Sequence, residues 1–175
     1  MSFFITTPIY YVNDVPHIGH AYTTIACDIF SRFNKLKNED TFFLTGTDEH
    51  GQKVEKAALA QNKDTQIFVD EMSNNFRELV PYLGCDNDDF IRTTDKKHKS
   101  AAQFLWNKLK SNNQIYLSNY EGWYSIRDEA FYQESELTKT ENGFVAPSGA
   151  TVEWVKEESY FFKLSEWEKK LIDYY

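Results

Sequence analysis

Two of the four histidines in this chain, His17 and His20, lie three residues apart on either side of a dipeptide that contains Gly19. They fall where a strand-like segment, FFITTPIYY, gives way to a segment of helical periodicity. The i, i+3 spacing puts both rings on one side of the first helical turn. A helix N-terminus favours phosphate, and a glycine lets a ligand come close, so the motif predicts a phosphate contact. Two histidines without a chemical role remain an alternative for this motif alone.

A second group of polar residues follows the next predicted strand, in LTGTDEHG. Asp48, Glu49 and His50 come directly after the apolar run, and carboxylates at a strand end can hold an ammonium group or a magnesium–phosphate complex. Two alternatives stay open: Asp48 as the N-cap of the following helix, and a histidine–acid metal cluster. The cluster is disfavoured because such residues spread along a sheet edge instead of forming a tetrahedron. Polar groups on two successive strand ends together predict a small-molecule site.

The elements that must position these residues alternate along the chain. Apolar periodicity and capping residues predict, in chain order, a strand over 3–11, a helix from Ile18, a strand over 40–48, helices over 55–61 and from Asp64 or Thr65, a strand over 89–94 and a helix after Asp95. This order is typical of a Rossmann-like α/β fold with a mainly parallel nucleotide-binding sheet. On the first helix, a stripe of large apolar residues is predicted to be buried: Ile18, Tyr22, Ile25, Ile29, Phe33 and Leu36.

The pattern changes after about Asn113. From there on, short alternating segments are separated by Gly, Pro, Asn and Ser, which predicts a small, mainly antiparallel β module. The sequence therefore predicts two regions. Residues 1–112 would form the first half of a Rossmann-like domain, and residues 113–175 would form a module inserted into it or appended to it.

Charge and cysteine content limit the classes of function. The formal net charge is -8, with 13 Lys+Arg against 15 Asp+Glu in residues 1–112 and 6 against 12 in residues 113–175. This balance argues against an extended basic face, so no DNA binding is expected and any polyanion needs a local site. Cys27 and Cys85 form no CxxC pair, which favours a reducing, intracellular setting. With no signal-peptide pattern and no run of about 18 apolar residues, a soluble cytoplasmic protein without a membrane partner is expected.

Read together, PIYYVNDVPHIGHAYTT and FFLTGTDEHGQK resemble the class I methionyl-tRNA synthetases. HIGH at 17–20 is similar to the first signature of class I synthetases, and TDEHG is the form that this family uses. DDFIRTTD, YEGWYS and SYFFKLS also resemble family segments, so the resemblance extends over essentially the whole chain. It implies that methionine is activated by ATP, with Mg²⁺, to methionyl-adenylate and then transferred to tRNA(Met). Glu49 and His50 belong to the motif but receive no chemical role.

The resemblance also implies roles for particular residues. His17 and His20 are expected to be catalytic through contacts with the ATP phosphates, where positioning and charge stabilisation do most of the work. Asp48 is expected to hold the methionine ammonium group. Ile9 and Tyr11 are expected to line the methionine pocket, since a thioether is best recognised by apolar and aromatic walls. The residues expected near the nucleotide are Thr7, Asn13, His17, Gly19 and His20.

Many members of the family bind zinc through CxxC knuckles in the inserted connective-peptide domain. At the corresponding place, WYSIRDEAFY has Ser125 and Asp128, and VAPSGATVEW has no cysteine either. No thiolate zinc site and no other metal site are therefore expected on this chain. The thirteen aromatic residues from Tyr120 onward could supply the packing instead. The resemblance implies that this module helps to position the tRNA acceptor end, and a purely scaffolding role is the alternative.

Members of the family are also much longer than this chain. A KMSKS loop, the second half of the nucleotide fold and a helical anticodon-binding domain are expected after Tyr175, so these residues alone are expected to be inactive. KKHKS at 96–100 lies upstream of the β module and is interpreted as a solvated basic helix end. Two other functions stay open: a small stand-alone nucleotidylyltransferase with an HxGH motif, and a non-catalytic nucleotide-binding module.

Overall fold

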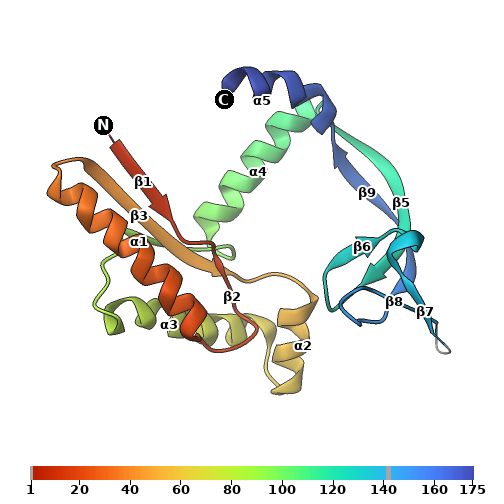
Figure 1. Ribbon diagram of the computed structural model, residues 1–175, viewed down its shortest axis with the longest axis horizontal. Coiled ribbons are helices and arrows are strands. Elements are labelled where there is room, and N and C mark those ends of the chain that lie inside the picture. Colours follow the sequence, from red (N-terminus) through yellow and green to blue (C-terminus); the bar gives the residue numbers. More distant parts are fainter. Residues whose placement is uncertain (1, 141–142) are drawn as a thin grey trace. The chain divides into compact units, whose positions relative to one another are not determined.

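The computed structural model describes residues 2–140 and 143–175 (Figure 1). The chain divides into two compact units, Met1–Ala101 and Ala102–Tyr175. The division falls inside helix α4 (Lys96–Ser111), and the sequence pattern changes about a dozen residues later, near Asn113. The boundary drawn from the sequence, after residue 112, stays a prediction.

The first unit contains a parallel sheet in which β3 pairs with each of the other strands. Its elements, in chain order, are β1 (Ser2–Thr6), β2 (Tyr10–Tyr11), α1 (Ile18–Leu36), β3 (Asp40–Asp48), α2 (Gln52–Ala60), α3 (Thr65–Tyr82) and β4 (Asp89–Arg92). The alternation of strands and helices is the predicted one, and α1 begins at the predicted residue. The Rossmann-like α/β fold expected from the sequence is therefore confirmed.

The strand predicted over 3–11 is two strands. Residues 2–6 of β1 pair with residues 40–44 of β3, and pairing resumes with Tyr10 opposite Thr47 and Tyr11 opposite Asp48. Pro8 lies in the interruption, and a proline has no N–H to give to a sheet. The interruption has a consequence for the site, because β2 brings Tyr11 beside the last residue of β3.

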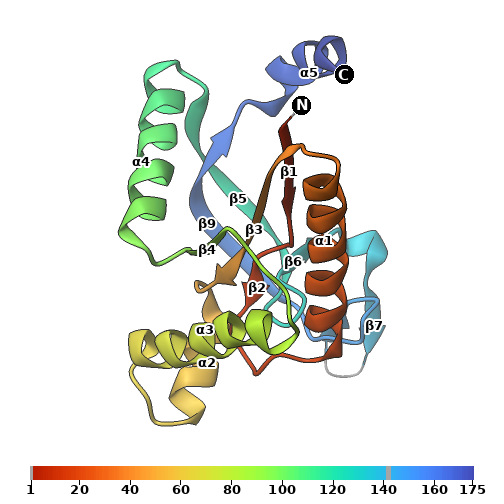
Figure 2. The same cartoon turned by 90° about the vertical axis from the view of Figure 1, so that its left-hand side faces the viewer.

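The predicted burial of the apolar stripe on α1 is wrong. Ile18 is 85% exposed, and the other members of the stripe are also exposed. The buried residues of α1 are small or polar: Ala21, Thr24, Cys27, Asp28, Ser31 and Asn34. This face packs on β1 and β3, along which the helix runs (Figure 2). Asp28 is satisfied there, since it accepts hydrogen bonds from the Arg32 side chain at 2.6 Å and from the Asp86 N–H at 2.9 Å.

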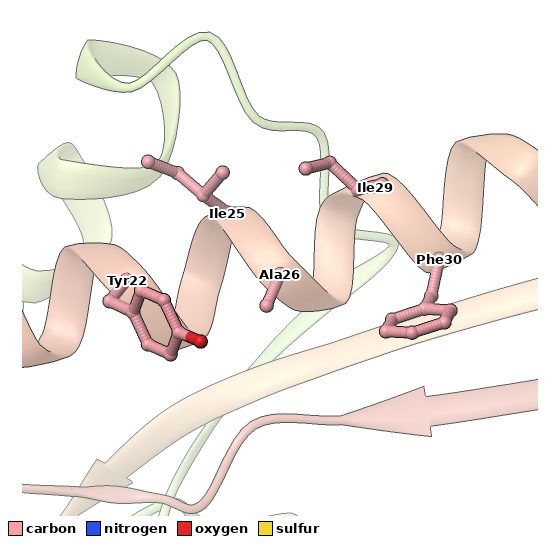
Figure 3. Close-up of a pocket in the computed structure, with 5 residues that line it drawn as sticks. All are labelled: Tyr22, Ile25, Ala26, Ile29 and Phe30. Carbon is pink, nitrogen blue, oxygen red and sulfur yellow. The ribbon is translucent and has the colours of Figure 1, made fainter.

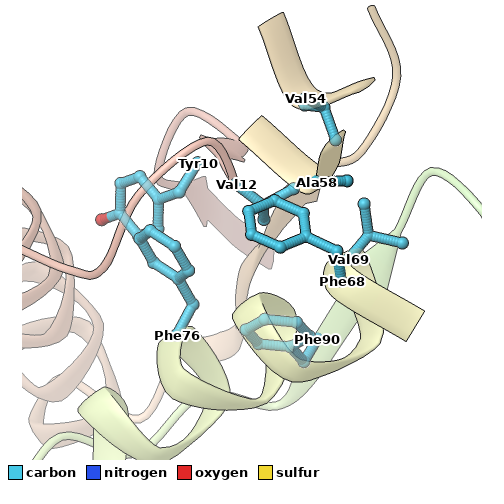
Figure 4. Close-up of a cluster of buried hydrophobic side chains, with 8 residues drawn as sticks. All are labelled: Tyr10, Val12, Val54, Ala58, Phe68, Val69, Phe76 and Phe90. Carbon is cyan, nitrogen blue, oxygen red and sulfur yellow. The ribbon is translucent and has the colours of Figure 1, made fainter. Parts of the chain in front are cut away.

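The main apolar core of the first unit lies between β2, α2, α3 and β4 (Figure 4). Its buried members are Tyr10, Val12, Val54, Ala58, Phe68, Val69, Phe76 and Phe90. Phe68 and Phe76 belong to the helix predicted from Asp64 or Thr65, and both are buried. Asp64 caps α3 as expected, because its carboxylate accepts the N–H groups of Gln66 and Ile67. The core fixes α3 against the strand ends that carry the candidate site.

The second unit is built on a long antiparallel pair. Strand β5 (Ile115–Ser125) runs beside β9 (Glu153–Phe162), and β6 (Ala130–Tyr132) pairs with the end of β5. The remaining elements are the hairpin β7 (Thr138–Thr140) and β8 (Gly143–Val145), the 3₁₀ helices η1 (Glu134–Glu136) and η2 (Leu164–Trp167), and α5 (Glu168–Tyr174). All strand pairs in the described part of this unit are antiparallel, which confirms the expected β module.

Candidate functional site

The two histidines of the HIGH segment form the N-terminal cap of α1. His17 is the N-cap residue, and its Nδ1 accepts the N–H of Gly19 at 3.1 Å. His20 reaches back, and its Nδ1 accepts the N–H of His17 at 3.0 Å. The two rings stack with their centroids 3.8 Å apart. This is a reciprocal capping box in which histidines replace the usual hydroxyl and carboxylate residues.

The capping bonds determine which nitrogen of each histidine ring carries the proton and can donate a hydrogen bond. A neutral imidazole that accepts a hydrogen bond at Nδ1 carries its proton on Nε2. Burial lowers the pKa of His20 below its usual value, and the neighbouring His17 lowers it further, so His20 is neutral at pH 7. Both capping histidines therefore present an Nε2–H donor at a helix N-terminus, where backbone N–H groups also favour an anion.

Gly19 is required for this arrangement. A Cβ atom on Gly19 would lie 2.9 Å from Cε1 of His17, too close for an ordinary contact. A side chain at this position would therefore push the His17 ring away from the N–H that it caps. The sequence pattern assigned Gly19 to close approach by a ligand, and the geometry adds a second reason, namely room for His17.

Tyr10 packs against His20 and was not singled out by the sequence pattern. It is 6% exposed, and its hydroxyl hydrogen-bonds Thr24 at 2.8 Å and donates to the carbonyl of His20 at 3.2 Å. Its ring and that of Phe76 contact the His20 ring edge-on, with centroids 4.7 Å and 5.0 Å away. Burial raises the pKa of Tyr10, so the hydroxyl stays protonated. The only signal in the sequence was a second tyrosine beside Tyr11.

Asp48 is the last residue of β3 and is half-buried. The alternative in which it caps the next helix is wrong, because α2 begins at Gln52 and its N-cap is Gly51. Tyr11 is the register partner of Asp48. A Cβ atom on Gly51 would lie only 2.5 Å from the Tyr11 hydroxyl oxygen. Gly51 also has a φ of 111°, which favours glycine. A carboxylate and a tyrosine ring therefore share the strand ends of β2 and β3.

The other candidate residues differ in exposure. Ile9 is 42% exposed, and Asn13 is exposed in the loop before α1. Thr7 is 2% exposed, and its hydroxyl is within 2.7 Å of the Thr45 hydroxyl, so that side chain is used inside the fold. The exposed pair can still meet a ligand directly. The Thr7 N–H also donates inside the fold, to the carbonyl of Leu44 at 3.2 Å, so only the backbone carbonyl of Thr7 is left for a ligand.

Glu49 takes no part in the exposed site and is buried behind it. Its carboxylate accepts both Nε and Nη2 of Arg92, at 2.7 Å and 2.9 Å, and hydroxyl donors from Thr47 and Thr94. His50 is exposed, with Nε2 3.4 Å from the carbonyl oxygen of Thr93. The sequence pattern predicted no role for Glu49. The feature that could have indicated the Glu49–Arg92 pair is an arginine at the end of the next strand.

Three residues of the apolar stripe of α1 help to line a separate pocket on the outer face of the helix (Figure 3). It has a volume of about 310 Å³ and is lined by Tyr22, Ile25, Ala26, Ile29 and Phe30. No titratable group other than the tyrosine hydroxyl lines it, so it offers shape and apolar surface without catalytic chemistry.

A polar cluster in the second unit joins the segments WYSIRDEAFY and VAPSGATVEW, in which the sequence has no cysteine for a zinc knuckle. The Asp128 carboxylate accepts the hydroxyls of Ser148 and, at 3.0 Å, Tyr132, and the Asp128 N–H donates to Ser125 at 3.2 Å. The hydrogen bond from Ser148 lowers the pKa of the Asp128 carboxyl. Hydroxyls and one carboxylate that already bond each other do not match the thiolate and imidazole set that tetrahedral zinc requires.

The described part of the chain offers neither a clustered metal site nor a membrane-spanning helix. Within residues 2–140 and 143–175 no three histidine, cysteine or acidic side chains gather closely enough to hold a metal ion. Across the same ranges no helix is both long and apolar enough to cross a membrane. The histidine–acid metal cluster left open by the sequence therefore has no support in the part of the chain that is described.

A parallel sheet whose strand ends present a histidine-capped helix and a carboxylate defines a nucleotide-binding class of protein. A family profile described as "tRNA synthetases class I (M)" matches residues 3–141. Because the match covers most of the chain, this chain belongs to that family of class I synthetases. Its similar relatives carry the name methionine–tRNA ligase. The one from Rickettsia bellii (strain RML369-C) is 59% identical over 174 residues, covering 99% of this chain and 34% of the relative.

More distant relatives agree. The methionine–tRNA ligase of Listeria monocytogenes serovar 1/2a (strain ATCC BAA-679 / EGD-e) is 49% identical over 181 residues, which is 99% of this chain and 27% of that protein. A solved structure of Mycobacterium tuberculosis methionyl-tRNA synthetase in complex with methionyl-adenylate matches with a TM-score of 0.90 and 43% identity, over 100% of this chain and 35% of that one. The chain thus spans about a third of the length of the relatives it matches.

Proposed function

We propose that this chain is the N-terminal part of a methionine–tRNA ligase. The observation that carries the proposal is the pairing of two Nε2–H donors at the start of α1 with the Asp48 carboxylate at the end of β3. An anion-binding helix start and an acid for an ammonium group are what a site for ATP and an amino acid needs. The relative solved with methionyl-adenylate supports both substrates.

In the proposed reaction an oxygen of the methionine carboxylate attacks the α-phosphorus of ATP. A new P–O bond forms, the bond to the β-phosphate oxygen breaks, and pyrophosphate leaves as methionyl-adenylate is made. The tRNA terminal hydroxyl then attacks the methionyl carbonyl, and AMP leaves. ATP enters as its Mg²⁺ complex, so the metal belongs to the substrate.

The histidines act in this proposal as hydrogen-bond donors through their Nε2–H groups. Negative charge builds on the phosphate oxygens during attack, and prepositioned donors stabilise it without reorganisation. Because the capping bonds fix both rings, the Nε2–H groups of His17 and His20 do not have to be ordered when ATP binds. Gly19 permits this geometry, and Asn13 and the Thr7 backbone complete the nucleotide side.

Asp48 holds the methionine ammonium group, and Tyr11 and Ile9 supply the walls for the rest of the substrate. An ionised carboxylate gives the charge-assisted hydrogen bonds that distinguish an amino acid from its des-amino analogue. Aromatic and apolar side chains accommodate a polarisable thioether. The pairing of Tyr11 with Asp48 in adjacent strands supports this division of the site.

The proposals for partners and location follow from the family. The second unit and further domains of the complete protein contact tRNA(Met), and the protein works in the cytoplasm. The second unit needs no zinc, which is supported by the Ser125–Asp128–Ser148 hydrogen bonds.

The test is methionine-dependent exchange of pyrophosphate into ATP, catalysed by the protein from the complete reading frame. Replacing His20 with Asn is expected to lower kcat about 10²- to 10³-fold, because one charge-stabilising donor is lost. Replacing Asp48 with Asn is expected to act chiefly on methionine, raising its KM about 10²-fold with little effect on that of ATP. Exchange without methionine, or adenylyl transfer by these 175 residues alone, would support the stand-alone nucleotidylyltransferase. No binding of ATP or methionine in calorimetry would support the non-catalytic module.

A further inference from the structure

A buried ion pair lies behind the strand end that carries Asp48, and the proposed reaction does not use it. The Glu49 side chain is 0% exposed and that of Arg92 is 19% exposed. Each carboxylate oxygen accepts one nitrogen of the Arg92 fork and one threonine hydroxyl, from Thr47 on Oε1 and from Thr94 on Oε2. Glu49 therefore has no oxygen left over for a substrate, and any effect on the reaction must pass through other residues.

A gain in stability does not by itself explain why Glu49 and Arg92 form a buried ion pair. Removing two charges from water is costly, and an apolar pair of similar size is often as stable. A bidentate arginine–carboxylate pair does fix the orientation of its two side chains, because its two parallel hydrogen bonds allow one geometry. Burial by itself raises the pKa of Glu49, but the bonds from Arg92, Thr94 and Thr47 outweigh it and keep the carboxyl ionised.

The pair extends the contact between β3 and β4 past the end of the sheet. Regular pairing of these strands ends with Thr47 opposite Arg92. Beyond that point the Glu49 N–H donates to the Thr93 hydroxyl at 2.9 Å, and the Thr93 N–H donates to the carbonyl of Thr47 at 3.3 Å. Together with the side-chain ion pair, these bonds hold the backbone of Glu49 in one orientation.

Asp48 is bonded to Glu49 through one peptide unit, so this orientation is passed on to it. In extended chain, successive side chains point to opposite faces, and a Glu49 side chain held inward by Arg92 turns Asp48 to the other face. On that side Asp48 has Tyr11 as its register partner. Arg92 is itself held by Asp70 of α3, at 2.6 Å, which anchors the pair to the helix layer.

We propose that Glu49 and Arg92 are positioning residues that aim the Asp48 carboxylate at the ammonium group of the amino-acid substrate. This inference rests on the proposed function, since it concerns the same site. It makes the selectivity for an α-amino group depend on a pair of side chains that never touch the substrate.

The test uses the protein from the complete reading frame with Glu49→Gln, which keeps the size of the side chain and removes its charge. The KM for methionine is expected to rise about tenfold, while the KM for ATP changes less than about twofold. A des-amino analogue of methionine, methylthiobutanoate, is the second probe, measured as a competitive inhibitor. Its inhibition constant is expected to stay within about twofold, because it has no ammonium group to lose.

Glu71→Gln is the matched control, because Glu71 forms an exposed ion pair with Lys63 on the same helix layer and does not contact Arg92. It is expected to leave both constants unchanged. If Glu49→Gln does not fold, Arg92→Lys, which keeps the charge but not the fork, is judged by the same constants. Equal weakening of methionine and the analogue, or an unchanged KM for methionine, would overturn the inference. A wild-type protein without methionine-dependent exchange would instead overturn the proposed function.

Discussion

In the first unit Phe43, Phe68 and Phe76 are at most 1% exposed, whereas in the described part of the second unit no aromatic ring is buried. The second unit gathers its rings on both faces of the β5–β9 ribbon, where they contact one another at the surface. Tyr120 and Phe131, for example, meet edge-to-face with centroids 4.4 Å apart. The polar groups differ as well: Glu49 is buried with an arginine, and Asp128 is bonded to hydroxyls near the surface.

The two units therefore differ in the kind of binding surface that each can provide. A layered α/β core buries enough apolar surface to hold a charged pair in one geometry, and such a support is what a catalytic site requires. A three-stranded sheet and a two-stranded one of this size have little interior, so their rings stay available for contacts with other molecules. The first unit is thus suited to fixed small-molecule chemistry and the second to a larger, adaptable surface.

The sharpest test of this contrast is one large-to-small substitution in each unit of the 175-residue chain. Phe76→Ala is expected to lower the free energy of unfolding by about 3–5 kcal/mol, because the ring is fully enclosed and touches Tyr10 and His20. Phe131→Ala is expected to cost about 1–2 kcal/mol, since its ring is half-exposed. Urea unfolding of both variants measures this. Equal losses would show that the aromatic cluster of the second unit is a true core.

The buried charge in the first unit gives the next prediction. Arg92→Met leaves the Glu49 carboxylate buried without its cation and is expected to cost about 3 kcal/mol at pH 7. In the native protein the pKa of Glu49 is lowered, so its contribution to stability is present at neutral pH and is lost as the pH falls through that lowered pKa. Without Arg92 burial raises the pKa above the unfolded value, so the variant should regain stability on acidification. The difference between wild type and variant should therefore shrink from pH 7 to pH 4.5.

Lys97→Met is the control for that measurement. Lys97 pairs with Asp89 at the surface, where both side chains are about half exposed, and the expected change is below about 0.5 kcal/mol. A difference between wild type and Arg92→Met that does not vary with pH would mean that Glu49 is not the group responsible.

The smallest effects are expected in the polar cluster of the second unit. If this cluster is held by hydrogen bonds and not by zinc, an excess of EDTA should leave the thermal unfolding of the chain unchanged. Asp128→Asn keeps an acceptor for Ser148 and Tyr132 and is expected to lower the melting temperature by less than Phe131→Ala does. The control is Glu153→Gln, an exposed carboxylate in the same unit. A clear loss of stability with EDTA would show that this unit holds a metal.

Much of the local structure could be predicted from the sequence. The start of α1, the bounds of β3, the Asp64 cap and the change to antiparallel strands all follow from interactions between residues close in the chain. The same holds for the place of His17 and His20 at the start of the helix, although their capping of that helix was not predicted. Asp48 could be placed at a sheet edge for a similar reason, since a strand ends where its apolar run ends.

The rest depended on contacts between distant residues. Periodicity locates an apolar stripe on α1, but it does not say which face the sheet covers, and here the sheet covers the face with Ala21, Thr24 and Asp28. Ala21 and Thr24 are small, and Asp28 accepts the N–H of Asp86, which lies 58 residues away in sequence. Likewise Glu49 and Arg92 are 43 residues apart, and only the parallel pairing of β3 with β4 brings them together.

The sequence by itself thus determined the order of the elements, the Asp64 cap and the types of side chain at the strand ends, because these depend on short-range geometry. The tertiary structure decided which face of α1 is buried, which tyrosine supports His20 and which charge is locked behind Asp48. Burial and long-range pairing are properties of the whole fold, and no local pattern in the chain specifies them.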